Sequence, residues 1–159
     1  MDPVAPAASR VEMTQLVMPS HANVLGSAFG GTVMQWTDLA AAMAAMRHAR
    51  LPVVTASIDQ LDFLSPVRIG QIAILAAQVN AVFRTSLEVG VEVSTEDPMT
   101  GERRRCCNAW LTFVALGPDG RPTELPPLAA ASEEERRRER AAVARREARL
   151  ALRRTLAGR

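Results

Sequence analysis

The most regular pattern of hydrophobic and polar positions lies at residues 85–96, where Leu87, Val89, Val91 and Val93 alternate with polar residues or glycine. Such alternation predicts a half-buried antiparallel strand. Longer apolar runs rich in β-branched residues, bounded by proline or glycine turns, predict further strands. These are expected at residues 11–18, 53–64, 71–83 and 103–116.

A helix expected at about residues 31–48 is apolar nearly all round. It follows the Gly30-Gly31 pair, carries Arg47 and His48 at its C-terminal end and stops before Pro52. A helix of this kind needs cover on most sides, and one long, strongly bent antiparallel sheet wrapped around it would supply that cover. The order of one strand, one helix and four strands therefore predicts an α+β fold.

The chain ends in a second, very different helix. Ser132 followed by Glu135 predicts a capping box at its start, and the arginine-rich remainder suits its C-terminal end. We expect it to be mostly solvated, with few apolar anchors, namely Val143, Leu150, Leu152 and Leu156. The expected organisation is a flexible leader (1–10), one domain (11–120), a linker (121–130) and a basic C-terminal helix (131–159).

Composition narrows the setting. No apolar run is long enough to span a membrane, and residues 1–8 do not resemble a secretion signal. The adjacent Cys106 and Cys107 are unlikely partners for a disulfide and lack the His/Cys neighbours of a metal site. We therefore expect a cytoplasmic protein without a metal or membrane association.

The net charge of +2 conceals an asymmetry. Residues 1–130 hold 9 Arg against 12 acidic residues, whereas residues 131–159 hold 10 Arg against 5 Glu. A basic tail could indicate a nucleic-acid-binding module. The glutamates interleaved in that tail and the acidic body argue against this function.

Asp38 is the main candidate for chemistry, because a carboxylate in so apolar a helix is costly unless it is paired or faces a wet cleft. It could act as a general base or nucleophile, or be a buried Asp bonded to Gln35 or a backbone amide. Gly31 lies about 10 Å from Asp38 along the helix axis, at the start of the helix. The first backbone amides of a helix have no hydrogen-bond partner within it. They could stabilise an oxyanion, or the glycines could simply allow close helix–sheet packing.

Several short motifs occur in a fixed order along the chain. They are Asn23-x-x-Gly26-x-x-x-Gly30-Gly31, Asp38-x-Ala40, Arg47-His48, Val54-Thr55-Ala56-Ser57, Asp62-Phe63-Leu64-x-Pro66-Val67-x-x-Gly70, Arg84-Thr85-Ser86-x-Glu88-Val89, Phe113-Val114-Ala115-Leu116 and Pro126-Pro127-Leu128. Each is weak alone, but the ordered set over roughly residues 11–155 resembles the acyl-CoA thioesterases of the hotdog fold, the acyl-CoA hydrolase branch.

The resemblance implies hydrolysis of acyl-CoA to a free acid and CoA, with CoA as part of the substrate and no separate cofactor. It implies that Asn23 and Asp38 form the hydrolytic pair, contributed by opposite subunits of a dimer, and that the Gly31 amide holds the oxyanion. The chain is then expected to be a homo-oligomer, a dimer of hotdogs that assembles into a hexamer.

The resemblance also implies CoA contacts at Thr55, Ala56 and Ser57, at Arg84, Thr85 and Ser86, and at an arginine of the terminal helix, Arg145 or Arg146. The acyl chain would lie in an apolar tunnel beside Met34, Met43 and the strand at 53–64. Without the resemblance, Arg84 is an ordinary solvated turn residue. A non-catalytic acyl-CoA sensor on the same fold is the alternative function.

Overall fold

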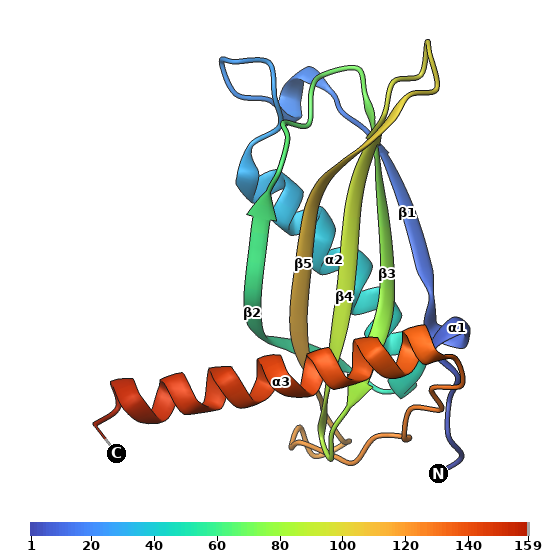
Figure 1. The fold of residues 1–159 in the computed structure, drawn as a ribbon, viewed down its shortest axis with the longest axis vertical. Helices are drawn as coiled ribbons and strands as arrows, with labels where there is room; N and C mark the ends of the chain where they lie inside the picture. The colour runs from blue at the N-terminus through green and yellow to red at the C-terminus, as the bar shows by residue number, and fades with distance from the viewer. Residues whose placement is uncertain (159) are drawn as a thin grey trace.

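The computed structural model describes residues 1–158, in which five antiparallel strands form one curved sheet (Figure 1). The strands follow the spatial order β1-β3-β4-β5-β2, so that β1 and β2 are the two edges. Their bounds are β1 Val11–Leu16, β2 Val53–Phe63, β3 Ile72–Val82, β4 Ser86–Glu96 and β5 Arg103–Ala115. The predicted strands agree to within one or two residues at each end.

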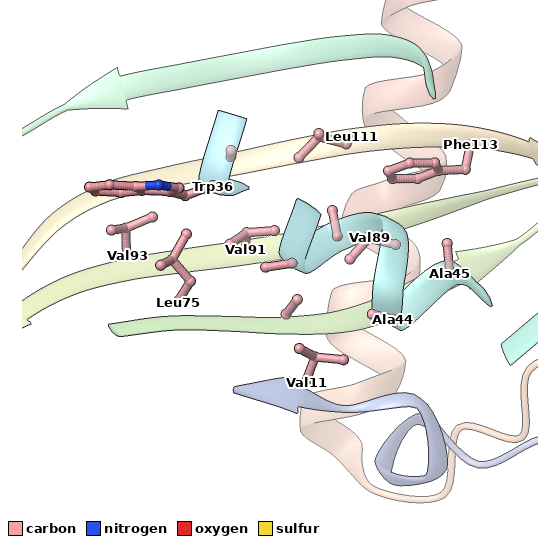
Figure 2. Close-up of a cluster of buried hydrophobic side chains, with 14 of the residues drawn as sticks. Val11, Trp36, Ala44, Ala45, Leu75, Val89, Val91, Val93, Leu111 and Phe113 are labelled. Atoms are coloured by element: carbon pink, nitrogen blue, oxygen red, sulfur yellow. The ribbon is translucent and has the colours of Figure 1, made fainter. Parts of the chain in front are cut away.

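The helix α2 (Gly30–Ala49) lies against the concave face of this sheet, as the α+β prediction required (Figure 1). Its core-facing positions are mostly alanine: Ala40, Ala41, Ala44 and Ala45 are all fully buried. Such small side chains let the helix backbone approach the strands, whose larger valines, leucines and Phe113 fill the remaining space (Figure 2). This is the hotdog arrangement.

The leader and linker meet beside this core. A short helix, α1 (Pro6–Ser9), ends in the fully buried Ser9, and a one-turn helix, η1 (Pro19–His21), follows β1. Val4 pairs with Leu128 of the linker through backbone hydrogen bonds. Part of the segment expected to be a flexible leader therefore packs against the domain.

The C-terminal helix α3 (Glu133–Leu156) begins at the capping box predicted for Ser132 and Glu135. It crosses the outer face of the sheet, opposite α2, and continues past β2 (Figure 1). The last position of the predicted helical segment, Arg159, lies outside the described residues. None of the helices within residues 1–158 is both long and apolar enough to cross a bilayer.

Three of the four apolar anchors expected for α3 were predicted wrongly, because Val143, Leu152 and Leu156 are exposed, whereas Leu150 is partly buried. Arginines attach the helix instead. Arg145 donates two hydrogen bonds, of 3.0 and 2.7 Å, to the carboxylate of Glu88, and its guanidinium stacks on Trp110. Arg149 pairs with Asp59 of β2. Long arginine stems cover the sheet while their charged ends find buried partners.

This arrangement also corrects the prediction that β4 is only half-buried. Part of the polar face of the strand lies under α3, where Glu88 is 2% exposed and accepts a further hydrogen bond from Asn80, whereas Glu92 on the same face is exposed. A buried carboxylate is tolerated there because Arg145 and Asn80 satisfy its oxygens. The alternation was predicted correctly, but the helix that covers its polar side could not be placed from the pattern.

His48 gives the stability of the domain a pH dependence. The side chain is buried at the end of α2, where its Nε2 bonds the carbonyl of Pro126 at 2.8 Å and its Nδ1 has no partner within residues 1–158. Burial lowers the pKa of this imidazole below its usual 6.5, although the hydrogen bond to Pro126 partly opposes the shift.

Because the folded chain resists the proton that the unfolded chain accepts, stability should be full above pH 6.5 and fall as the pH drops towards the folded pKa. The slope contributed by His48 is at most about 1.4 kcal/mol per pH unit. Denaturant unfolding of the wild type and His48→Gln across this window measures it. Identical slopes for the two proteins would contradict this role for His48.

Candidate active site

The start of α2 leaves backbone donors free. The amides of Thr32 and Val33 both bond the carbonyl of Phe29, but within residues 1–158 those of Gly30 and Gly31 have no acceptor. No side chain caps the helix. Such unpaired amides, at the positive end of the helix dipole, are suited to an anionic oxygen.

The two glycines differ in what surrounds them. A Cβ at Gly30 would touch the ring of Phe63 at 3.5 Å, whereas a Cβ at Gly31 would meet nothing within 4 Å. A contact of 3.5 Å is ordinary van der Waals distance, so close packing requires glycine at neither position. The amide of Gly31 remains open to an approaching group, in keeping with the oxyanion role predicted for it.

Asp38 lies two turns further along α2 and is half-buried. Its Oδ1 accepts a 2.7 Å hydrogen bond from the hydroxyl of Thr55 on β2. The side-chain partner of Asp38 is therefore Thr55. It is not Gln35, which was the partner expected if Asp38 were a purely structural residue. The contact orients one carboxylate oxygen and leaves Oδ2 without a hydrogen-bond partner in the described chain.

This contact is what the sequence analysis missed, since it assigned Thr55 to CoA binding alone. The neighbouring Ala56 sits at a β-bulge, where the pairing of β2 with β5 skips a residue between Thr55 and Ser57. Bulges re-aim side chains next to active sites. No sequence signal revealed the bulge, because it depends on the register between two strands.

Asn23 lies at the base of the loop between η1 and α2. Its Oδ1 accepts a 2.9 Å hydrogen bond from the Leu25 amide and a longer one from the Ser27 amide, while its own amide and carbonyl hold the same loop. The side-chain Nδ2 donates no hydrogen bond within residues 1–158. The loop is thus fixed with one amide donor unused, and no hydrogen bond links Asn23 to Asp38.

A broad apolar surface surrounds Asp38. On α2 it includes Met34, Leu39 and Met43, and it continues on the edge strand through Phe63, all of them exposed. Exposed apolar side chains gathered on one face are typical of an interaction or ligand surface. In the single chain, this side of α2 is therefore exposed to solvent, although an apolar helix was predicted to be buried on most sides.

A pocket of about 430 Å³ adjoins the free helix start and is mainly apolar. Its lining includes Gly30, Val33 and Phe63. Met34 and Met43, expected beside the acyl chain, do not line this pocket and belong to the exposed surface around Asp38.

The remaining residues expected to contact CoA are dispersed. Ser57 bonds Asp59 on β2, whereas Arg84, Thr85 and Ser86 form the turn into β4, with Arg84 exposed. The guanidinium of Arg145 is already committed to Glu88, which argues against its reaching a nucleotide.

The two cysteines are free thiols buried in β5. Burial, with smaller contributions from Asp62 and Cys106, raises the pKa of Cys107 to about 11. Cys107 therefore remains a protonated thiol at neutral pH, which argues against its use as a nucleophile.

Comparison with known sequences agrees with this geometry. Residues 25–102 match the thioesterase superfamily. The chain is 41% identical over 118 residues to an acyl-CoA thioester hydrolase of Bacillus subtilis, covering 74% of this chain and 69% of that protein. Mouse acyl-coenzyme A thioesterase 11 is 40% identical over 107 residues. The match covers 67% of this chain but only 18% of the mouse protein. A mouse cytosolic acyl coenzyme A thioester hydrolase is 32% identical over 126 residues, 74% of this chain and 33% of that protein.

Solved structures extend the match to nearly the whole chain. A hexameric acyl-CoA thioesterase without ligand superposes with a TM-score of 0.91 at 40% identity, covering 95% of this chain and 97% of that one. The acyl-CoA hydrolase of Staphylococcus aureus, solved with butyryl-CoA, CoA and CoA disulfide, superposes with a TM-score of 0.88 at 34% identity, covering 94% and 92%.

Three further structures of the S. aureus hydrolase carry alanine in place of one Asn, one Asp and one Thr. In that protein the Asn and Asp are fifteen positions apart, and the Thr follows the Asp by seventeen. Asn23, Asp38 and Thr55 have the same spacing here. From the identity and coverage of these matches, the chain belongs to the hotdog-fold acyl-CoA thioesterases of the thioesterase superfamily.

Proposed function

We propose that this chain hydrolyses acyl-CoA thioesters to free carboxylic acids and CoA. The observation that carries the proposal is Asp38, oriented by Thr55 and half-exposed on the helix that begins with the free Gly31 amide. The matching spacing of Asn, Asp and Thr in a hydrolase crystallised with CoA supports it. The family relationship applies to this domain, which spans only a fifth or so of the mouse thioesterase 11.

In the proposed reaction Asp38 removes a proton from water, and the hydroxide adds to the thioester carbonyl carbon. The negative charge moves to the carbonyl oxygen, where the Gly31 amide stabilises it. Collapse of the tetrahedral intermediate breaks the C–S bond and expels the CoA thiolate, which takes up a proton. Direct attack by Asp38 would instead form an acyl anhydride that water then cleaves.

We place the complete site between two copies of the chain. Asn23 has an unused amide and no contact with Asp38, and β2 presents a free edge beside an exposed apolar surface. Antiparallel pairing of two β2 edges would cover that surface and bring Asn23 of one copy to Asp38 of the other. Three such dimers would form a hexamer, as in the hexameric relative.

In this dimer the CoA moiety would lie along Thr55, Ala56 and Ser57, with Arg84 and the hydroxyls of Thr85 and Ser86 available to its phosphates. The cytoplasm, the compartment named for a mouse relative, is the proposed location. A thiol-release assay over a series of acyl-CoA chain lengths tests the function. A protein that binds acyl-CoA but releases no thiol would instead be the non-catalytic sensor.

The hydrogen bond from Thr55 separates a positioning role from a CoA-binding role. Thr55→Val keeps the shape of the side chain but removes the hydroxyl that orients Asp38. We expect kcat to fall about tenfold with KM nearly unchanged, because the carboxylate loses its preferred orientation. Thr55→Ser, which retains the hydroxyl, should recover most of the rate. A rise in KM at constant kcat would assign Thr55 to substrate binding instead.

A further inference from the structure

The direction of α3 is fixed by two ion pairs in succession. Arg145 is clamped to the buried Glu88 on β4, and one turn later Arg149 donates to Asp59 and Thr112. Asp59 belongs to β2, the last strand of the sheet on that side. The end of α3 and the two residues after it, which together we call the overhang (residues 150–158), therefore project beyond the sheet (Figure 1).

The sheet-facing side of the overhang is apolar. Leu152 and Leu156 follow Arg145 and Arg149 at helical spacing, so they lie on the same side of α3. They line a groove of about 470 Å³ with Ser57 and Ile58 of the edge strand. The two leucines are nevertheless 58% and 78% exposed, because within residues 1–158 they meet the edge strand on one side alone.

An antiparallel pair of β2 edges would supply the missing surface. Its two-fold axis runs perpendicular to the sheet, so both copies keep their outer faces on the same side. A strand added beyond β2 then continues the sheet directly beneath the overhang. We propose that the overhang docks on the outer face of a second copy of this chain and straps the two sheets together across the β2 seam.

The charges of the overhang favour a second copy of this chain as its partner. The overhang carries Arg153 and Arg154, and α3 has no acidic residue after Glu147. The outer face of β2 offers Asp62, which is exposed and whose only hydrogen-bond partner within residues 1–158 is Gln60. A second copy thus presents a carboxylate that has no ion-pair partner within residues 1–158, besides apolar area, to a basic and apolar helix end.

The proposal rests on the β2 dimer of the proposed function, but not on hydrolysis. It is tested by a photo-crosslinking amino acid placed at position 156. The control position is Val143, which lies on the opposite side of the helix from Leu152. Full-length protein in unlabelled and ¹⁵N-labelled forms is mixed during refolding, and crosslinked peptides are mapped by mass spectrometry.

We expect position 156 to crosslink the outer face of β2 or β5 in peptides that pair light with heavy chains, and position 143 not to do so. Crosslinks confined to single chains, or equal yields at both positions, would overturn the proposal. Since no substrate is needed, failure of this experiment leaves the hydrolytic function untouched, and an inactive protein leaves the crosslinking result valid.

A matched pair of variants gives a second readout. Leu152→Ser/Leu156→Ser removes two leucines from the sheet-facing side, and Val143→Ser/Leu150→Ser removes two apolar residues from the opposite side. With equal helix content by circular dichroism, only the first should accelerate subunit exchange between tagged copies, by about tenfold or more. Equal exchange rates in the two variants would contradict docking through the leucines.

Discussion

Asp38→Asn should lower kcat for acyl-CoA hydrolysis by about a thousandfold, the loss expected when a general base or nucleophile is removed. Asn has the same size and can still accept the hydrogen bond from Thr55. The substitution therefore removes the charge and basicity while preserving the local packing. Thiol release under saturating acyl-CoA measures the effect.

The stability of Asp38→Asn and its affinity for CoA serve as controls for this experiment. We expect the thermal unfolding midpoint and the binding of CoA to stay close to wild type, because Asp38 is half-buried and the one polar contact that its side chain makes within residues 1–158 is retained. Wild-type turnover in Asp38→Asn would refute the mechanism and favour the acyl-CoA sensor. A large loss of stability would instead identify Asp38 as a structural residue.

Asn23→Asp should lower kcat about a hundredfold, the second-largest effect expected here. The new carboxylate can accept the same hydrogen bonds from Leu25 and Ser27, so the loop remains closed. It lacks the Nδ2 donor and places a negative charge where we propose that water or the substrate carbonyl is held.

Comparison with Asn23→Ala separates catalysis from loop structure. Alanine removes both the donor and the acceptor, so Asn23→Ala should lose activity and also loosen the loop, measured as faster hydrogen exchange at Leu25 and Ser27. Asn23→Asp should lose activity alone. Full activity in Asn23→Asp would mean that the side chain serves only to close the loop.

The hotdog layout was predictable because the sequence pattern determines it locally. Strict alternation at Leu87, Val89, Val91 and Val93 defines the inner face of β4, and the apolar helix containing Ala40 and Ala44 can be buried only against a curved sheet. Capping at Ser132 was equally local. These features depend on residues a few positions apart.

Features that depend on distant pairs were not predictable. The pairing of Arg145 with Glu88 joins residues 57 positions apart, so the sequence did not reveal how the mostly solvated helix is attached to the sheet. The bond from Thr55 to Asp38 joins β2 to α2 beside a bulge in β2. The apolar helix singled out Asp38 as a candidate, but only the structure gave its partner.

The most direct test of a site shared between two chains is complementation. Asp38→Asn and Asn23→Asp chains, each nearly inactive alone, are co-expressed with separate tags and assayed after purification. If each site takes Asn23 from one copy and Asp38 from the other, random assembly restores about a quarter of wild-type activity, since half of the dimers are mixed and each mixed dimer has one intact site out of two. Activity no higher than that of the separate variants would show that both residues act within a single chain and would contradict the account.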